Sequence, residues 1–260
     1  MNREEFQEFF EKNRGNFISG IHNYCDRWCE RCAFTSKCSV FAMDEQRGNK
    51  TKDNPEAFVE TVSENFKLVM EMLVHMAEEK GIDLNNLEED PEYEMEEKKR
   101  EEFADKHILS IQSKDYSDRG RNWFQENENV LKTLSDKLNQ DISLGLTNEN
   151  ILKEVDAIED AIEVIHWFNF QIYVKLMRAL RHGELDLEYE DPIQNDVNGS
   201  AKVALLGTER SLASWGVLLR NLPEQEDSIL PILLLLEKIR TGILKTFPDV
   251  NQFIRPGFDE

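Results

Sequence analysis

Apolar residues return every three or four positions over most of this chain, the spacing that places them on one face of an α-helix. Nowhere do apolar and polar residues alternate as they do in a half-buried strand. We therefore expect an all-α fold, a multi-helix bundle of seven to eight helices. The pattern predicts helices near residues 3–14, 17–32, 54–80, 94–113, 117–143, 148–182, 200–222 and 228–246.

The prolines agree with these predicted helix boundaries. Five of the seven lie outside the predicted helices, and Pro55 is at the start of the helix predicted over 54–80, where a missing N–H and a fixed φ do no harm. Pro231 is expected in the first turn of the last helix, which tolerates proline.

The negative charge of the chain argues against some classes of binding partner. The chain has 52 Asp and Glu against 31 Lys and Arg, a net charge of -21, so its summed field repels phosphate backbones and anionic lipid. The longest apolar run, residues 232–236, is far shorter than the ~20 residues of a membrane-spanning helix. The first residues are acidic, unlike a secretory signal. We expect a cytoplasmic protein with neither nucleic acid nor membrane as a partner.

The cysteines carry the clearest chemical signal. All four, Cys25, Cys29, Cys32 and Cys38, fall within fourteen positions as C-x3-C-x2-C-x5-C. In a reducing compartment, thiols grouped in this way indicate a metal or iron–sulfur site. We therefore expect residues 1–50 to form a cysteine-rich N-terminal helical segment carrying a metal site, and residues 51–260 to form an acidic helical bundle.

Several interpretations of the cysteines compete. On a helix over 17–32, Cys25, Cys29 and Cys32 continue an apolar stripe, so they could be small buried hydrophobes. A disulfide involving Cys38 would instead make a redox switch. An unbroken helix would hold Cys25 and Cys32 ~10.5 Å apart, too far for one zinc ion but suited to separate irons of a [4Fe–4S] cluster. Zinc remains the alternative if the helix breaks before Cys32.

Two short resemblances bear on the cluster. The spacing of Cys25, Cys29 and Cys32 resembles that of the radical S-adenosylmethionine enzymes, with Arg31 where that family has an aromatic residue. The spacing of Cys29, Cys32 and Cys38 resembles the last three cysteines of the iron–sulfur loop in helix-hairpin-helix DNA glycosylases. Each resemblance covers at most fourteen residues. Both imply an iron–sulfur cluster and neither implies an activity, since the surrounding features of those families are missing.

The neighbours of the cysteines are suited to thiolates. Arg27, Arg31 and Lys37 form a local basic group that would lower thiol pKa values and offset thiolate charge. Trp28 and Phe34 could shield a centre from water. His22 is a candidate extra ligand.

A second and weaker candidate site lies in the helix predicted over 148–182. Glu163 and His166 have the Glu-x-x-His spacing of dinuclear carboxylate centres in helix bundles. The matching pair is missing, because Glu71 and His75 are expected to face solvent, opposite the stripe of Phe58, Val62, Val69, Leu73 and Met76. A core histidine at position 166 is the simpler interpretation.

These patterns support three functional hypotheses. The first is an iron–sulfur redox or sensing protein with Cys25, Cys29, Cys32 and Cys38 as ligands of a [4Fe–4S] cluster. The second is a non-catalytic interaction module with a structural zinc ion, and the third a ferritin-like dinuclear carboxylate oxidase built around Glu163 and His166. The chain has no nucleotide-binding or hydrolase motif, so the sequence leaves open whether it is an enzyme.

Overall fold

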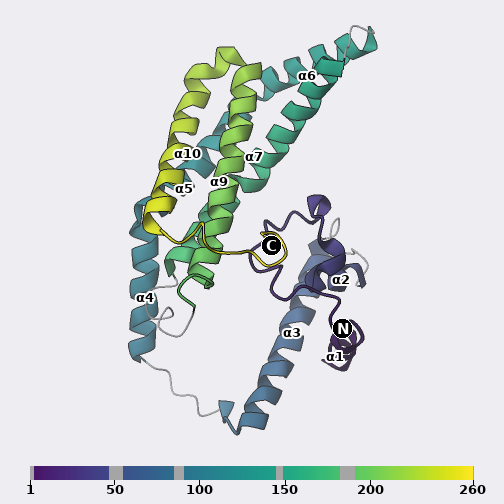
Figure 1. Ribbon diagram of the computed structural model, residues 1–260, viewed down its shortest axis with the longest axis vertical. Helices are drawn as coiled ribbons and strands as arrows, with labels where there is room; N and C mark the ends of the chain where they lie inside the picture. Colours follow the sequence, from purple (N-terminus) through teal and green to yellow (C-terminus); the bar gives the residue numbers. More distant parts are fainter. Residues whose placement is uncertain (1–2, 47–54, 85–90, 145–148, 182–190, 260) are drawn as a thin grey trace. The chain divides into compact units, whose positions relative to one another are not determined.

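The described part of the protein is mostly helical (Figure 1), and in this computed structural model it comprises residues 3–46, 55–84, 91–144, 149–181 and 191–259. Over these residues the chain forms nine α-helices and no strand. The expected all-α, multi-helix fold is confirmed.

The chain divides into two compact units. Residues 1–95 and 256–260 form unit 1, and residues 96–255 form unit 2. The division thus falls within α4 (Pro91–Lys106), whereas the sequence suggested a boundary near residue 50, which lies outside the described residues. The last five residues return to the N-terminal unit, an arrangement that the sequence did not indicate.

Unit 2 holds most of the hydrophobic core. Its centre is formed by α5 (Ile108–Glu126), α7 (Glu149–Arg181), α9 (Asp196–Asn221) and α10 (Glu226–Thr246), with α7 and α9 in the most extensive contact. These four helices lie side by side in Figure 1. Phe168, Leu176, Trp215, Leu236 and Ile239 are among the fully buried side chains. Among its described residues this unit also contains most of α4, helix α6 (Glu128–Ser143) and the 3-10 turn Pro223–Gln225.

The described residues of unit 1 bury fewer side chains than those of unit 2. Its helices are α1 (Arg3–Lys12), α2 (Ser39–Gln46) and α3 (Pro55–Lys80), joined by turns that include the 3-10 helices η1 (Cys29–Arg31) and η2 (Thr35–Lys37). Rings of Phe9 and Phe17 stack with centroids 5.8 Å apart, which ties α1 to the turns that follow it. Among the described residues of this unit, the buried apolar side chains are Ile21, Leu68 and Ala77.

Several predicted helix boundaries are wrong. The expected helix over 17–32 does not form, and turns followed by η1 occupy that stretch. The break expected between the helices over 94–113 and 117–143 is also misplaced, because α5 runs through it and the chain breaks at His107 and at Asn127 instead. Helix α2 was missed, and Pro231 lies inside α10 rather than in its first turn.

The predicted face of α3 is also wrong. Val62, Val69, Leu73 and Met76 are all about half exposed, while Leu68 and Ala77 are buried. His75 is half-buried and pairs with Glu79, with Nδ1 and Oε1 3.4 Å apart. Phe58 lies among the residues whose side chains are not described.

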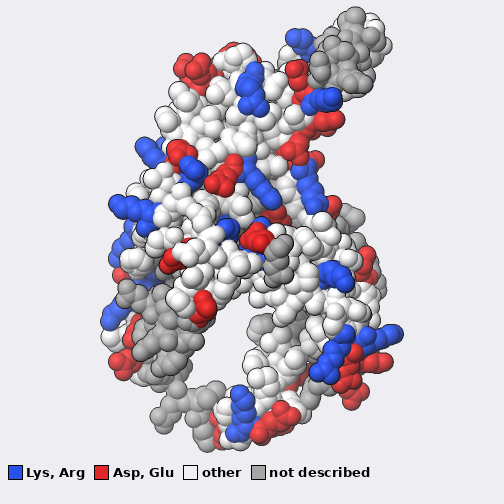
Figure 2. Space-filling view, in the orientation of Figure 1, with Lys and Arg blue, Asp and Glu red and all other residues white. Residues whose placement is uncertain are grey.

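Acidic and basic side chains are both scattered over the surface seen in Figure 2. Within the described ranges, no helix is both long enough and apolar enough to cross a membrane.

Candidate metal centre

The four cysteines lie on a run of tight turns between α1 and α2. Cys25 belongs to a bend, Cys29 begins η1, and Cys32 and Cys38 follow η1 and η2 in extended conformation. The Cys32 N–H donates to the Cys29 carbonyl at 3.2 Å, so the C-x2-C unit is closed into a single turn. The helix-based argument against zinc therefore fails, since Cys25 and Cys32 are not separated by an unbroken helix.

Local backbone features shape these turns. The Asp26 carboxylate accepts a hydrogen bond from the Trp28 N–H at 3.1 Å, a side-chain turn that competes with helix formation. Arg27 has φ of 61°, in the left-handed region that a residue with a side chain rarely adopts. Gly15 and Gly20, which precede the cysteines, also have positive φ. These conformations explain why the predicted helix does not form.

Two cysteine sulfurs already have hydrogen-bond partners. The Phe34 N–H donates to the Cys32 sulfur at 3.4 Å, a contact that strengthens when the sulfur is a thiolate. The Cys25 thiol donates to the His22 carbonyl at 3.5 Å. Cys38 caps α2, because its carbonyl accepts from the Ala42 N–H at 3.1 Å, and the start of a helix favours a negative charge.

All four cysteines line one small cavity, which we call the cysteine cavity. It measures about 20 Å³, and its other walls are largely apolar. They comprise Ile21, His22, Asp26, Arg27, Trp28, Thr35, Phe41 and Phe258. Turns that are separate in the sequence thus present their thiols to a shared space. All four residues are half-buried, free thiols, so the structure contains no disulfide among them.

Burial and mutual repulsion affect these thiols. Burial raises the pKa of the Cys29 thiol above its ordinary value, and the nearby Cys25, Cys38 and Cys32 raise it further. A bound cation would reverse this effect, because it stabilises thiolates. The guanidinium of Arg31, which is adjacent to Cys32 in the sequence, lies over the Trp28 ring, 4.0 Å from its centroid.

His22 adds a nitrogen to the same cavity. Its Nδ1 atom is buried and has no hydrogen-bond partner. Burial lowers the pKa of His22, and the charge of Arg27 lowers it further. Both effects favour the neutral imidazole, the form that binds a metal ion.

The thiols share a cavity without converging on a point. Across the residues that the structure describes, no three His, Cys, Asp or Glu side chains are grouped closely enough to hold a single metal ion. A single ion at this site would therefore require the thiols to move inward.

Glu163 and His166 do not form a comparable site. Both are exposed on α7, so the prediction that His166 lies in the core is wrong. Its ring lies against Phe124, with centroids 4.2 Å apart, and partial burial there lowers the pKa of the imidazole. The core-facing side of α7 is formed by neighbours such as Ile165 and Phe168, which are buried.

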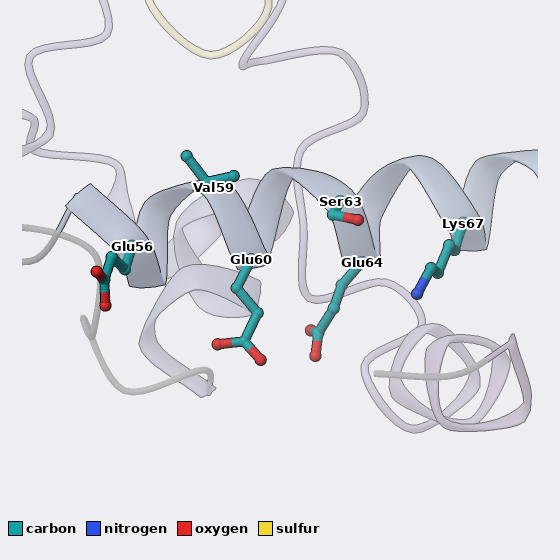
Figure 3. Close-up of a pocket in the computed structure, with 6 residues that line it drawn as sticks. All are labelled: Glu56, Val59, Glu60, Ser63, Glu64 and Lys67. Carbon is teal, nitrogen blue, oxygen red and sulfur yellow. The ribbon is translucent and has the colours of Figure 1, made fainter.

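A second depression, of about 640 Å³, lies along α3 (Figure 3). Glu56, Glu60 and Glu64 line it one helical turn apart, together with Lys67. The three carboxylates are exposed and belong to one helix, and in Figure 3 they extend from it separately rather than toward one point. This depression lacks the thiols and the aromatic walls of the cysteine cavity.

Phe41 and Phe258 were missed as parts of the site. Phe41 follows Cys38 by three residues and belongs to the helix α2 that was not predicted. Phe258 is 220 residues from Cys38 in the sequence, so no local pattern could have connected the two.

Comparison with known proteins adds no relative: no family model, no curated protein and no solved structure matches this chain.

Proposed function

We propose that unit 1 is a metal-binding module in which Cys25, Cys29, Cys32 and Cys38 are the ligands. The observation that carries this proposal is the cysteine cavity, where all four thiols face one space with apolar walls. Thiolates are soft ligands that select zinc and iron–sulfur clusters over magnesium or calcium. The donor set therefore fits either centre.

An iron–sulfur cluster is the first candidate. A [4Fe–4S] cluster takes each of four thiolates on a different iron, so its ligands surround it instead of meeting at one ion. Thiols that share a cavity without forming a single-ion group are consistent with that arrangement. Through such a cluster the protein would act in electron transfer or in sensing of redox state.

A structural zinc ion is the second candidate, and the size of the cavity favours it. About 20 Å³ is room for one water-sized group. The described part of unit 1 buries few apolar side chains, and small units with a weak core are often held together by a metal. With zinc, unit 1 would be a non-catalytic interaction module.

Anaerobic purification of the full chain, followed by metal and sulfide analysis and an absorption spectrum, tests the proposal. A brown protein with about four irons and four sulfides, bleached by dithionite, supports the cluster. A colourless protein with about one zinc supports the second candidate. Protein free of both metals, even after reconstitution with each, would contradict both.

Variants locate the ligands. Replacing all four cysteines with serine should abolish metal binding, while the pair Glu163→Gln and His166→Gln should leave it unchanged. If iron survived the cysteine replacement and was lost from the second variant, the ferritin-like hypothesis would replace the present one. Circular dichroism of each variant shows whether the helices of unit 2 remain folded.

A further inference from the structure

The C-terminal residues belong to the cysteine site. Pro256–Glu260 group with the N-terminal unit, and the C-terminus in Figure 1 lies among the turns that precede α2. Phe258 lines the cysteine cavity. Its ring meets that of Phe34 edge to face, with centroids 5.1 Å apart and planes at 73°. The cavity therefore has one wall from a segment far away in the sequence.

Gly257 allows this segment to fit closely. Its φ is +76°, and a Cβ atom there would lie 2.9 Å from Ile18 Cδ1 and 3.1 Å from Ile21 Cδ1. A residue with a side chain at this position would have a strained backbone, and its Cβ would clash with Ile18 and Ile21. Pro256 packs beside Gly20, with its Cγ 3.9 Å from where a Cβ of that glycine would lie. The turn at residues 256–258 is thus seated on Ile18 and Ile21 with its aromatic ring over the thiols.

We propose that this C-terminal segment closes the cysteine cavity and controls how readily small molecules reach the thiols. Phe258 replaces water at the apolar wall, and its loss would open that wall to chelators and alkylating reagents. This role in shielding the thiols stands by itself, whereas a role in retaining a metal rests on the proposed function. Binding is reciprocal, so a centre that is retained by the segment also holds the segment in place.

The first experiment measures thiol accessibility in metal-free protein. Phe258→Ala should speed alkylation of the four cysteines by iodoacetamide by roughly two- to tenfold, the range that loss of an aromatic contact implies. Ile254→Ala is the control, because Ile254 is also a large apolar residue near the C-terminus but is 48% exposed and does not line the cavity. Equal alkylation rates in wild type and Phe258→Ala would overturn the proposal.

Two glycine variants distinguish displacement of the C-terminal segment from the effect of backbone strain alone. Gly257→Ala adds a methyl group against Ile18, while Gly15→Ala adds one at a similar φ of +83° with nothing within 4 Å. We expect faster alkylation for Gly257→Ala alone. Equal acceleration in both variants would mean that strain in unit 1, and not displacement of the segment, exposes the thiols, and would overturn the proposal.

The second experiment repeats the comparison with metal-loaded protein and follows transfer of the metal to a coloured chelator. Phe258→Ala should release metal faster than Ile254→Ala, again by roughly two- to tenfold. Faster alkylation with no metal bound in any sample would contradict the proposed function and leave the closing role standing. Bound metal with unchanged release and alkylation rates would support the proposed function and overturn the closing role.

Discussion

Two histidines show how the surroundings of a residue decide its chemistry. His22 and His166 were both candidate ligands from sequence, His22 because it lies near the cysteines and His166 because it has Glu-x-x-His spacing with Glu163. His166 is exposed on α7 and packs on Phe124, whereas His22 has a buried, unpartnered Nδ1 at the cysteine cavity. A buried nitrogen without a partner is costly, and coordination or a hydrogen bond to a bound centre would remove that cost.

We predict that His22→Ala weakens metal binding by roughly 10–100-fold, the usual effect of removing a group that supports a metal site. Competition with a chelator of known affinity measures it. His75→Ala is the matched control, because His75 belongs to the same unit but pairs with Glu79 on α3. Equal affinity in wild type and His22→Ala would show that His22 is only a neighbour of the centre.

At the scale of elements, glycines decide how closely helices approach in unit 2. Gly207 of α9 faces Phe168 of α7, and a Cβ there would lie 2.8 Å from Phe168 Cδ1. The two helices pack closely because this position has no side chain. The 3.6-residue pattern predicts which face is buried but does not report the distance between helix axes.

We predict that Gly207→Ala destabilises unit 2 by about 1–3 kcal/mol, because the added methyl overpacks the contact with Phe168. Gly216→Ala, in the same helix, should instead be neutral or stabilise by up to about 1 kcal/mol through helix propensity. Its Cβ would meet only the end of Arg220, at 3.9 Å. Urea unfolding of both variants measures the difference, and a Gly207→Ala protein as stable as Gly216→Ala would contradict the packing argument.

The break between α4 and α5 also depends on a histidine. His107 caps α5, with its Nδ1 accepting a hydrogen bond from the Leu109 N–H at 3.2 Å. Burial lowers the pKa of His107 below 6.5. Only the neutral ring can accept this bond, so the cap requires the deprotonated form. Histidine is not among the usual capping residues, which is why the sequence predicted an unbroken helix there.

We predict a stability that falls as the pH falls through about 6.5. The unfolded chain takes up a proton on His107 at a pH where the folded chain does not, so acid favours unfolding. His107→Asn keeps a capping oxygen without a titratable ring, so it should reduce this decline. The decline that remains is due to His22 and His166, whose pKa values are lowered in the same direction. His107→Ala should cost about 0.5–2 kcal/mol near pH 8, where the neutral cap is present.

Urea unfolding at several pH values between about 5.5 and 8 checks this prediction. An identical pH dependence in wild type and His107→Asn would show that the cap contributes nothing to it.

At the scale of the whole molecule, the two units differ in what stabilises them. Nearly all the buried apolar side chains of the described chain lie in unit 2, while unit 1 has Ile21, Leu68 and Ala77. Hydrophobic burial therefore contributes more to the stability of unit 2 than to that of unit 1. A thiolate-bound metal would add to the stability of unit 1 by coupling binding to folding.

If unit 1 binds a metal as proposed, removing that metal should increase hydrogen exchange in residues 17–46 and 256–259 while α7, α9 and α10 keep their protection. Mass-spectrometric hydrogen exchange before and after chelation measures this. The quadruple cysteine-to-serine variant should show the same pattern without a chelator. Loss of protection throughout unit 2 would contradict an independent role for the metal, and no change in unit 1 would mean that the metal contributes little to its folding.

The amino-acid pattern alone determined the fold class, the approximate positions of α1, α3, α7 and α10, and the four cysteines as the chemical feature of the chain. Helical periodicity and residue spacing are local properties, so local reasoning recovers them. It failed over 17–32, where positive φ at Gly20 and Arg27 and the Asp26 side-chain turn outweigh an apolar stripe.

Only the tertiary structure decided which side chains surround the cysteines and which faces are buried. It brought Phe258 to the cavity, left His166 and the stripe of α3 exposed, and assigned the last residues to the first unit. These outcomes depend on contacts between residues far apart in the chain. Such contacts are set by packing and loop closure over the whole molecule, for which no short stretch of sequence carries a signal.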